Sequence, residues 1–388
     1  MKSKDIIEED KKYIAGTYAR FPVAFKEGKG SRLYDYDGRE YVDCGSGIAV
    51  NIFGVNDGEW KNAVIAQMNS IQHASNLYYT KPQADLARLL CERTGAKKVF
   101  FGNSGAEANE CAIKAARKYG EIKHGADRKQ IITLKESFHG RTLATLAATG
   151  QDAFHKYYGP FPEGFVYADP TIEGVEACMN ERTCAVMIEC IQGESGVNVL
   201  DKDFVQAVEK LCRERDIIFI CDEVQTGNGR TGRLYAYQAY GVSPDIVTTA
   251  KGLGGGLPIG ACMLFEKCAG VFGYGDHGST FGGNPVVCAG AYSILSRIDE
   301  KLLVSVREKG EYFRECLKKI DGVKEVTGMG LMIGIHTDKP AAEVANECMK
   351  RGLLVLTAHS NVRLLPPLTI SKDDIDFALK ILNEVISQ

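Results

Sequence analysis

The 388-residue sequence has no excess of either charge, because 47 lysines and arginines stand against 50 aspartates and glutamates. A general nucleic-acid binder usually carries a strong basic excess, so that class of protein is disfavoured. No apolar run approaches the ~20 residues that a membrane-spanning helix requires. The first residues, MKSKDIIEEDKKY, lack the apolar core of a secretory signal peptide. We therefore expect a cytoplasmic protein that acts on small molecules and binds neither nucleic acid nor membranes.

The thirteen cysteines include no C-x-x-C pair, so the sequence carries no zinc or thioredoxin signature and no metal site is expected. Several lie inside apolar runs, among them Cys184, Cys190 and Cys221, which is typical of free buried thiols in a reducing compartment. The sequence also lacks a G-x-x-x-x-G-K-[ST] loop, and its glycine cluster does not open a helix as G-x-G-x-x-G does. These absences disfavour nucleotide and dinucleotide binding.

The length suits two domains better than one. From about residue 96 to 265, short apolar runs alternate with helical stretches, which indicates βαβ units around a mostly parallel sheet of an α/β protein. Near the N-terminus the pair Asp37–Gly38 predicts a hairpin turn between strands. Helical patterns and short strands return after residue 285. We expect a large domain over residues 46–284 and a smaller α+β domain that joins residues 1–45 to 285–388.

Three chemically active side chains stand at the ends of predicted strands. Glu189 follows VMI, Asp222 ends IIFICD, and Lys251 ends DIVTTAK. Ligands of an open α/β sheet bind beyond the carboxyl ends of its strands, so we expect these residues at one edge. Burial of an ammonium is penalised, yet Lys251 ends an apolar run and is followed at once by glycines. A lysine removed from water loses its proton more readily and becomes a nucleophile.

A fourth predicted strand, KVFF, ends in the small-residue loop GNSGAEANE. One interpretation is a helix cap, in which Ser104 begins the helix and Glu107 reaches back. The other is a phosphate site made by the Ser104 hydroxyl and the backbone N–H groups of Gly105 and Ala106. Both can hold together. Pyridoxal phosphate needs an amine to bind its aldehyde, hydrogen-bond donors for its phosphate and a carboxylate for its pyridine nitrogen. The sequence offers all three, which indicates a pyridoxal phosphate site.

Six ordered segments carry a resemblance to a known family: NSGAEANE, SFHGRT, IECIQGESG, DEVQTGNGRTG, TTAKGLGGGLPIGA and STFGGNP. Over residues 15–386 the chain resembles the class III pyridoxal-phosphate aminotransferases, and within them the acetylornithine and succinylornithine aminotransferase branch. The resemblance implies fold type I, with a mostly parallel seven-stranded sheet in the large domain and a smaller α+β domain. It also implies a homodimer with shared active sites. The implied reaction is transamination between N2-acetylornithine and 2-oxoglutarate, a step of arginine biosynthesis.

The resemblance also implies a role for each cofactor residue. Lys251 would bind pyridoxal phosphate covalently and later move the substrate's proton, while Asp222 would pair with the pyridine nitrogen. Gln225 would contact the ring's phenolic oxygen and Phe138 would stack on the ring. The remaining cofactor contacts would come from Ser104, Gly105 and Ala106 at the phosphate, from Glu189, and from Thr280 at the phosphate of the partner subunit.

The substrate residues implied by the resemblance are Arg141, Glu194, Ser279 and Arg363. Arg141 and Arg363 would each hold a carboxylate by paired hydrogen bonds. Glutamate has two carboxylates and would use both arginines, whereas an acylated ornithine has one, far from its reacting amine. Glu194 would then pair with Arg363. The alternative for both arginines is a surface ion pair.

Some positions depart from the family pattern. Cys190 stands where proline is usual, Asn228 replaces a commonly apolar residue, and NIFGVNDGEW lacks the usual histidine and proline. Gly47 falls where ornithine-specific members tend to have tyrosine, which favours an acylated donor. Alternatives on the same site are ornithine, succinylornithine, 4-aminobutyrate or succinyl-diaminopimelate as donor, or an aminomutase, epimerase or decarboxylase reaction. A metabolite-binding regulator is disfavoured, because the sequence shows no DNA-binding appendage and no damaged site.

Overall fold

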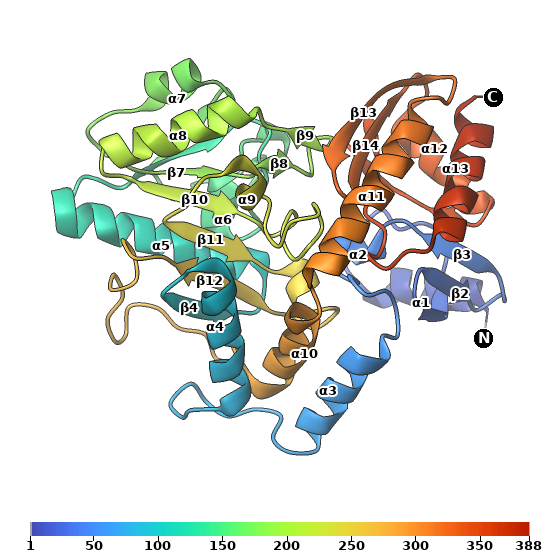
Figure 1. Ribbon diagram of the computed structural model, residues 1–388, viewed down its shortest axis with the longest axis horizontal. Coiled ribbons are helices and arrows are strands. Elements are labelled where there is room, and N and C mark those ends of the chain that lie inside the picture. Colours follow the sequence, from blue (N-terminus) through green and yellow to red (C-terminus); the bar gives the residue numbers. More distant parts are fainter. Residues whose placement is uncertain (1, 388) are drawn as a thin grey trace.

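The computed structural model describes residues 2–387, and a seven-stranded sheet with the order β4-β12-β11-β10-β7-β5-β6 lies at its centre (Figure 1). β12 runs antiparallel to both of its neighbours, and the other paired strands run parallel. The mostly parallel seven-stranded sheet expected from the sequence is therefore confirmed. Its strands are β4 (Lys98–Gly102), β5 (Gln130–Leu134), β6 (Phe165–Ala168), β7 (Thr183–Ile188), β10 (Ile218–Asp222), β11 (Ile246–Thr249) and β12 (Gly260–Leu264).

Helices cover both faces of this sheet, which explains why its strands read as continuous apolar runs. In β10, Ile218 and Ile220 pack in one hydrophobic cluster with α5 (Gly105–His124), whereas Phe219 and Cys221 pack in another with α8 (Lys202–Glu214). The alternation follows from the two-residue period of a strand. α8 begins at a cap in which the Asp201 side chain accepts a hydrogen bond from the Phe204 amide. Its buried residues Phe204, Val205, Val208, Leu211 and Cys212 form one stripe.

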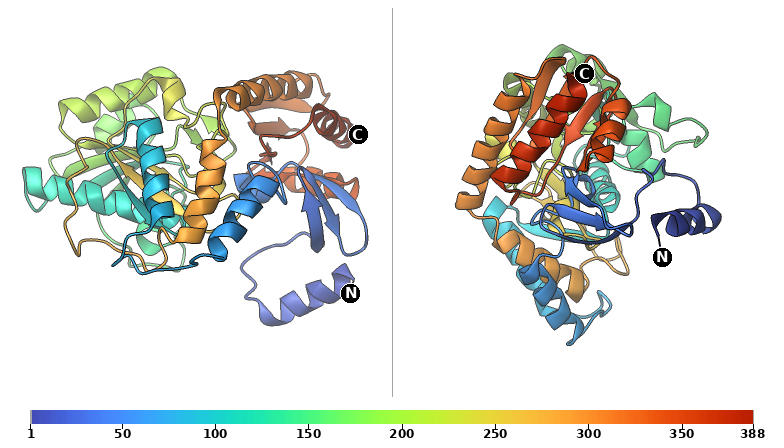
Figure 2. Two further views of the ribbon diagram at one scale, coloured as in Figure 1. Left: turned by 60° about the horizontal axis from the view of Figure 1, so that its bottom comes forward. Right: turned by 90° about the vertical axis from the view of Figure 1, so that its right-hand side faces the viewer.

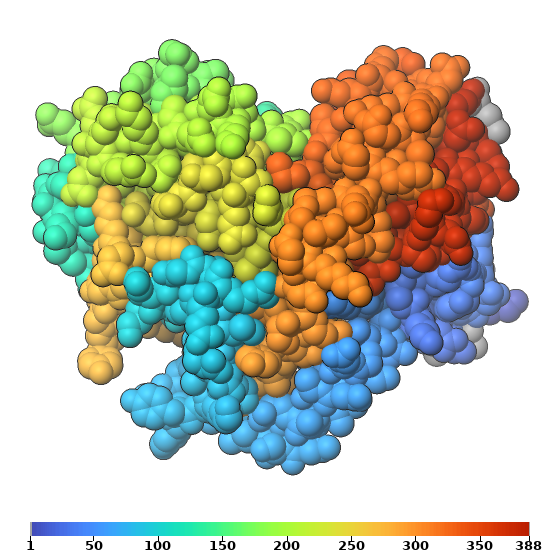
Figure 3. Space-filling view, viewed as in Figure 1, coloured from blue at the N-terminus to red at the C-terminus, as the bar shows by residue number. Residues whose placement is uncertain are grey.

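A second lobe combines the beginning and the end of the chain (Figure 3). One of its sheets has the order β1-β2-β3-β15, in which β15 from the C-terminal region pairs parallel with β3. The turn predicted at Asp37–Gly38 joins β2 and β3, and Gly38 has φ +85°. The other sheet has the order β13-β14-β17-β16. The strands are β1 (Phe25–Lys29), β2 (Arg32–Asp35), β3 (Glu40–Asp43), β13 (Val323–Met329), β14 (Met332–Thr337), β15 (Leu353–Leu354), β16 (Leu356–Ala358) and β17 (Asn361–Leu364).

The remaining elements connect and flank the lobes. α10 begins at the first residue assigned to the small domain from the sequence, yet it packs against α3 and α4 of the large lobe. The domain boundary between residues 284 and 285 therefore stays a prediction. α1 stands off from the rest of the chain (Figure 2). These elements are α1 (Ser3–Tyr13), α2 (Ser46–Ala49), α3 (Gly58–Met68), α4 (Lys81–Thr94), α6 (Leu143–Ala148), α7 (Ile172–Cys178), α9 (Tyr237–Tyr240), α10 (Pro285–Ser296), α11 (Glu300–Leu317), α12 (Ala341–Lys350), α13 (Lys372–Ile386), β8 (Ile191–Gln192), β9 (Asn198–Val199) and the 3₁₀ turns η1 (Asp152–Phe154) and η2 (Lys251–Leu253).

Three global observations bear on the kind of site to expect. All thirteen cysteines are free, and most are buried. Within residues 2–387, no three His, Cys, Asp or Glu side chains are grouped so that they could hold a metal ion. None of the helices in the same range is long and apolar enough to cross a bilayer.

Candidate active site

A cavity of about 450 Å³ opens at the carboxyl ends of the parallel strands. The loops after β4, β5, β7, β10 and β11 each contribute lining residues, as the strand-end rule predicts. The structure brings together nine residues singled out from the sequence: Ser104, Gly105, Ala106, Phe138, Arg141, Glu189, Asp222, Gln225 and Lys251. The other four, Glu194, Ser279, Thr280 and Arg363, lie outside the lining of this cavity.

Lys251 follows β11 after one residue, Ala250, and has the left-handed φ of +43°. Among residues 2–387 its ammonium has no hydrogen-bond or ion-pair partner. Burial lowers the pKa of the Lys251 ammonium, and nearby carboxylates such as Glu194 and Asp222 oppose this effect without cancelling it. The chain after it packs tightly, since a Cβ on Gly252 would lie 2.2 Å from Cδ1 of Ile52. An amine with these properties is available as a nucleophile.

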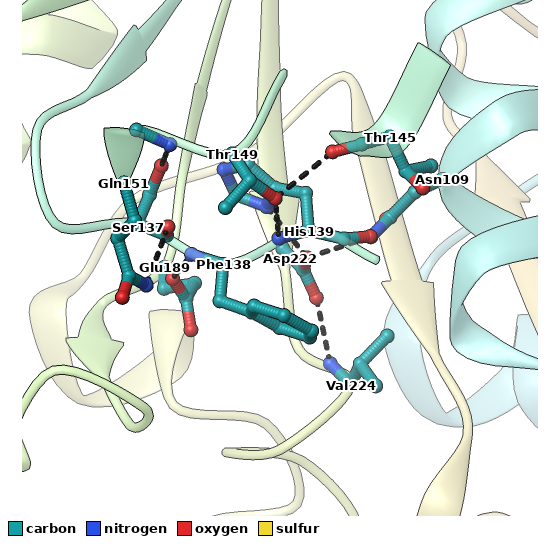
Figure 4. Close-up of polar contacts among 11 residues, drawn as sticks. Asn109, Ser137, Phe138, His139, Thr145, Thr149, Gln151, Glu189, Asp222 and Val224 are labelled. Carbon is teal, nitrogen blue, oxygen red and sulfur yellow. Dashed lines mark hydrogen bonds and ion pairs between the residues drawn. The ribbon is translucent and has the colours of Figure 1, made fainter. Parts of the chain in front are cut away.

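Asp222 is held by three donors at the end of β10 (Figure 4). Its Oδ2 lies 2.8 Å from Nδ1 of His139 and 2.8 Å from Nδ2 of Asn109, and its Oδ1 accepts a hydrogen bond of 3.0 Å from the Val224 amide. Burial alone would lower the pKa of His139, but the hydrogen bond and the charge of Asp222 outweigh burial and raise this pKa. Asp222 is therefore fixed in orientation beside an imidazole that favours its protonated form.

The strand-end argument missed His139 and Asn109. Both residues lie inside quoted segments, His139 in SFHGRT and Asn109 in NSGAEANE. Asn109 lies within α5, where its side chain also donates to the His139 carbonyl at 2.7 Å. A buried polar residue on an otherwise apolar helix face was the signal available in the sequence.

The loop after β4 is a helix cap, and its first amides are placed as an anion site would require. The Ser104 Oγ accepts a hydrogen bond of 3.2 Å from the Glu107 amide, and the Glu107 carboxylate accepts one of 2.6 Å from the Asn103 amide. The amides of Gly105 and Ala106 open α5 and have no partner within the helix. A Cβ on Gly105 would lie 2.6 Å from Val224, so only glycine fits there. The positive end of α5 therefore faces the cavity with free N–H groups.

Glu189 and Phe138 form the side of the cavity next to Asp222 (Figure 4). The Phe138 amide donates a hydrogen bond of 2.9 Å to the Glu189 carboxylate. Burial raises the pKa of Glu189, and the charge of Asp222 adds to this effect while His139 opposes it. The Phe138 ring lies at the cavity wall, half-buried, which suits stacking on a flat ligand.

Arg363, Glu194 and Gln225 form one polar cluster beside the cavity. Arg363, on β17, is 2% exposed and contacts Glu194 through two hydrogen bonds of 2.9 and 3.3 Å. The Gln225 amide donates to Glu194 at 2.9 Å and accepts from Arg363 at 3.0 Å. Burial would raise the pKa of Glu194, but the charge and hydrogen bonds of Arg363 lower it. The expected contact between Arg363 and Glu194 is present, whereas its role in substrate reading stays a prediction.

Arg141 has no such partner. Among residues 2–387 its guanidinium makes no hydrogen bond or ion pair, and it packs on the rings of Phe154 at 4.1 Å and Phe138 at 5.5 Å. It is exposed and lines the cavity. Its N–H groups are therefore available to a carboxylate.

Ser279 and Thr280 lie in a loop at the edge of the site. The Ser279 hydroxyl accepts hydrogen bonds from Nδ2 of Asn103 at 3.1 Å and from the Gly282 amide at 3.0 Å. Thr280 is exposed and does not line the cavity of its own chain. The predicted contact of Thr280 with the cofactor of a partner subunit remains a prediction.

The structure shows where three of the residues that depart from the family pattern lie. Asn228 is buried with φ +56°, and its Nδ2 donates to the Ala250 carbonyl at 3.2 Å and to Thr249 Oγ1 at 2.9 Å. Asn228 therefore supports the backbone that carries Lys251. Cys190 is buried, and its carbonyl accepts a hydrogen bond of 2.9 Å from the Tyr240 hydroxyl. Gly47 lines a second, mostly apolar cavity of about 610 Å³ rather than the one at Lys251.

The ends of the mostly parallel strands bring together a lysine without a partner among residues 2–387, a fixed carboxylate and a helix N-terminus suited to a phosphate. This combination defines a pyridoxal-phosphate-dependent enzyme of fold type I. The residues fit this cofactor, because Lys251 offers a free amine to an aldehyde and Asp222 a held carboxylate to a ring nitrogen. The cavity volume of about 450 Å³ accommodates the cofactor together with a small substrate.

Comparisons with known proteins name the family. The model of the class-III aminotransferases matches residues 13–386. The acetylornithine aminotransferase of Haemophilus ducreyi is 48% identical, with 100% of both chains covered, and that of Caldanaerobacter subterraneus is 47% identical, with 99% of both covered. Among solved structures, the ornithine aminotransferase from Toxoplasma gondii superimposes with a TM-score of 0.95 at 31% identity, covering 100% of this chain and 95% of that one. The chain belongs to the class-III aminotransferases, and it is a pyridoxal-phosphate-dependent aminotransferase.

Proposed function

We propose that the protein transfers the δ-amino group of N2-acetylornithine to 2-oxoglutarate, giving N-acetylglutamate 5-semialdehyde and glutamate, as a step of arginine biosynthesis. The observation that carries this proposal is the contrast between two arginines. Among residues 2–387, Arg141 in the cavity has no hydrogen-bond or ion-pair partner, while Arg363 is already paired with Glu194. The names of the relatives that are 43–48% identical over nearly the whole chain support the same donor.

Bound pyridoxal phosphate supplies an aldehyde and a ring that accepts electrons from the reacting carbon. The amides of Gly105 and Ala106 and the Ser104 hydroxyl would hold its phosphate at the positive end of α5. The Phe138 ring would stack on its ring. Asp222, oriented by His139 and Asn109, would hold a proton on the ring nitrogen.

Lys251 has two tasks that follow from its lowered pKa. Its neutral Nζ would be the group that holds the cofactor's aldehyde carbon, because the unprotonated amine is the nucleophile. With a substrate bound, the same Nζ would accept the proton from the reacting carbon and return it. A group that moves protons in both directions works best when its pKa lies near the working pH.

The two arginines read substrates of different shape. Acetylornithine has one carboxylate, remote from its reacting amine, which Arg141 binds while Glu194 keeps Arg363 neutralised. Glutamate has a second carboxylate next to its amine, and Glu194 has to release Arg363 to receive it. One site therefore accepts both substrates in turn.

A donor panel tests the proposal. Purified, cofactor-loaded protein is assayed with N2-acetylornithine, ornithine, succinylornithine, 4-aminobutyrate and succinyl-diaminopimelate, each with 2-oxoglutarate. N2-acetylornithine is expected to give the highest kcat/KM, with one glutamate formed per amine consumed. A higher kcat/KM for another donor would refute N2-acetylornithine as the preferred donor and identify that amine instead. Turnover without glutamate would indicate an aminomutase, epimerase or decarboxylase.

We also propose a cytoplasmic homodimer with shared sites. Thr280 lies outside the cavity of its own chain, next to Phe281, which is 61% exposed. Asn76 hydrogen-bonds the same loop and is followed by Leu77 and Tyr78, which are 85% and 69% exposed. Exposed apolar groups of this kind support an interface with a second copy. The free thiols support a reducing compartment. Light scattering on the purified protein is expected to give twice the chain mass.

A further inference from the structure

Phe154 stands behind the cavity wall and contacts two residues of that wall. It ends η1, is half-buried, and does not line the cavity. Its ring lies 4.1 Å from the Arg141 guanidinium and meets the Phe138 ring edge-on, with centroids 5.8 Å apart and an interplanar angle of 75°. Phe154 is thus the aromatic group nearer to Arg141, since the Phe138 ring is 5.5 Å from the guanidinium.

This contact matters because Arg141 packs on two aromatic rings, and the Phe154 ring is the nearer one. Its guanidinium has no hydrogen-bond or ion-pair partner among residues 2–387. A long unpaired side chain samples many rotamers, and ordering it when a substrate binds weakens binding. A cation on the face of an aromatic ring is attracted by the ring quadrupole, and the N–H groups at the edge of the guanidinium stay free for a carboxylate.

The backbone around Phe154 is well anchored. The Phe154 amide donates a hydrogen bond to the Gln151 carbonyl at 3.1 Å. The buried Gln151 side chain donates in turn to the Ser137 carbonyl at 3.0 Å, next to Phe138 (Figure 4). On the other side, the His155 ring contacts the Leu146 carbonyl at 2.9 Å. The turn is therefore a fixed support rather than a loose loop.

We propose that Phe154 is a positioning residue that holds the Arg141 guanidinium ready for the substrate carboxylate remote from the reacting amine. By this contact Phe154 sets the preference of the site for substrates that carry such a carboxylate. The inference rests on the proposed function in one respect, namely that Arg141 reads that carboxylate.

The test is a double-mutant cycle on the holoenzyme with glutamate as amino donor. The variants are Phe154→Leu, Arg141→Gln and the double variant, with Phe154→Tyr as the conservative replacement. In the wild-type background Phe154→Leu is expected to lower kcat/KM about tenfold, mainly by raising KM, as loss of a cation–π contact implies. In the Arg141→Gln background the same change is expected to have less than about a twofold effect, because Phe154 acts through Arg141. Phe154→Tyr is expected to retain most of the wild-type value.

A binding measurement gives a readout that does not depend on turnover. Glutarate carries two carboxylates and has no reacting group, and its dissociation constant for the holoenzyme is expected to rise about tenfold in Phe154→Leu by calorimetry. Tyr157→Leu, which changes an exposed aromatic residue of the same segment, is the matched control and is expected to leave this constant unchanged. If Phe154→Leu does not fold, Phe154→Met serves as the variant without an aromatic ring.

The proposal is overturned if Phe154→Leu lowers kcat/KM equally in both backgrounds, because the residue then acts through the fold or through Phe138. It is also overturned if glutarate binds wild type and Phe154→Leu alike. The proposed donor can fail separately. A protein that does not use N2-acetylornithine but shows the expected cycle with glutamate refutes the proposed function and supports the role of Phe154.

Discussion

The Glu194 carboxylate accepts two hydrogen bonds from the buried Arg363 guanidinium, with Oε1 2.9 Å from Nη1 and Oε2 3.3 Å from Nη2. The charge of Arg363 is therefore already paired with a carboxylate before any substrate enters. Removal of one member of a buried ion pair leaves the other uncompensated. A substrate carboxylate would then take the place of the missing Glu194 oxygen atoms.

Glu194→Ala is accordingly expected to favour dicarboxylate substrates. Binding of glutamate is expected to tighten, whereas KM for N2-acetylornithine is expected to rise because Arg363 is left without a partner. A hydrogen bond to a charged group contributes about 1.5–3 kcal/mol, so the ratio of the two KM values should change by about 10- to 100-fold. Separate half-reactions with each donor measure the ratio, and Glu194→Gln tests the charge at nearly constant shape. An unchanged ratio in both variants would contradict the masking role of Glu194.

Lys251 is predicted to be the residue that holds the cofactor covalently. Treatment of the holoenzyme with borohydride is expected to fix the cofactor to the peptide that contains Lys251, as detected by mass spectrometry. Lys251→Ala is expected to show no such adduct and to lose about 10²- to 10⁴-fold in kcat, the usual contribution of a positioned proton-transfer group. Circular dichroism on the variant checks that the fold is retained. An adduct on a different lysine would refute the assignment.

His139 is predicted to make stability depend on pH through its contact with Asp222. Its pKa in the folded protein is raised above the reference value of 6.5. A raised pKa means that the folded state binds the proton more tightly, so the stabilisation is fully present below about pH 6.5 and is lost as the pH rises through the raised value. The difference in unfolding free energy between wild type and His139→Asn is expected to be largest near pH 6 and to narrow toward alkaline pH. Denaturant unfolding across this range measures it, and a constant difference would argue against a protonated His139.

The strand-end residues could be predicted from the sequence because parallel strands deliver them to one edge without any knowledge of side-chain packing. Asp222 and Lys251 follow apolar runs that can only be buried strands, and β10 pairs directly with β11. The helix N-terminus at Ser104 was equally visible, since its capping pattern is local.

The residues that hold the strand-end side chains in place could not be predicted from the sequence in the same way. The contact of Asn109 with Asp222 joins residues 113 positions apart and depends on how α5 lies on the sheet. The pairing of β3 with β15 likewise joins the two ends of the chain. Phe154 lies in a short turn with no periodic pattern. These relationships arise from tertiary packing, which a single sequence does not encode in any local spacing.

Asn228 is predicted to stabilise the backbone next to Lys251 better than the apolar residue that is usual at its position. Its left-handed φ of +56° is tolerated better by asparagine and glycine than by branched side chains, and its amide holds the Ala250 carbonyl directly before Lys251. Asn228→Gly keeps the backbone freedom and loses the hydrogen bonds, whereas Asn228→Leu loses both. We expect Asn228→Gly to lower stability by about 1–3 kcal/mol, with Asn228→Leu lower still by about 1 kcal/mol for the strained φ. Thermal and denaturant unfolding measure these differences. If the strain rather than the hydrogen bond were decisive, Asn228→Gly would match wild type while Asn228→Leu alone would fall, and Asn228 would have no part in holding Lys251.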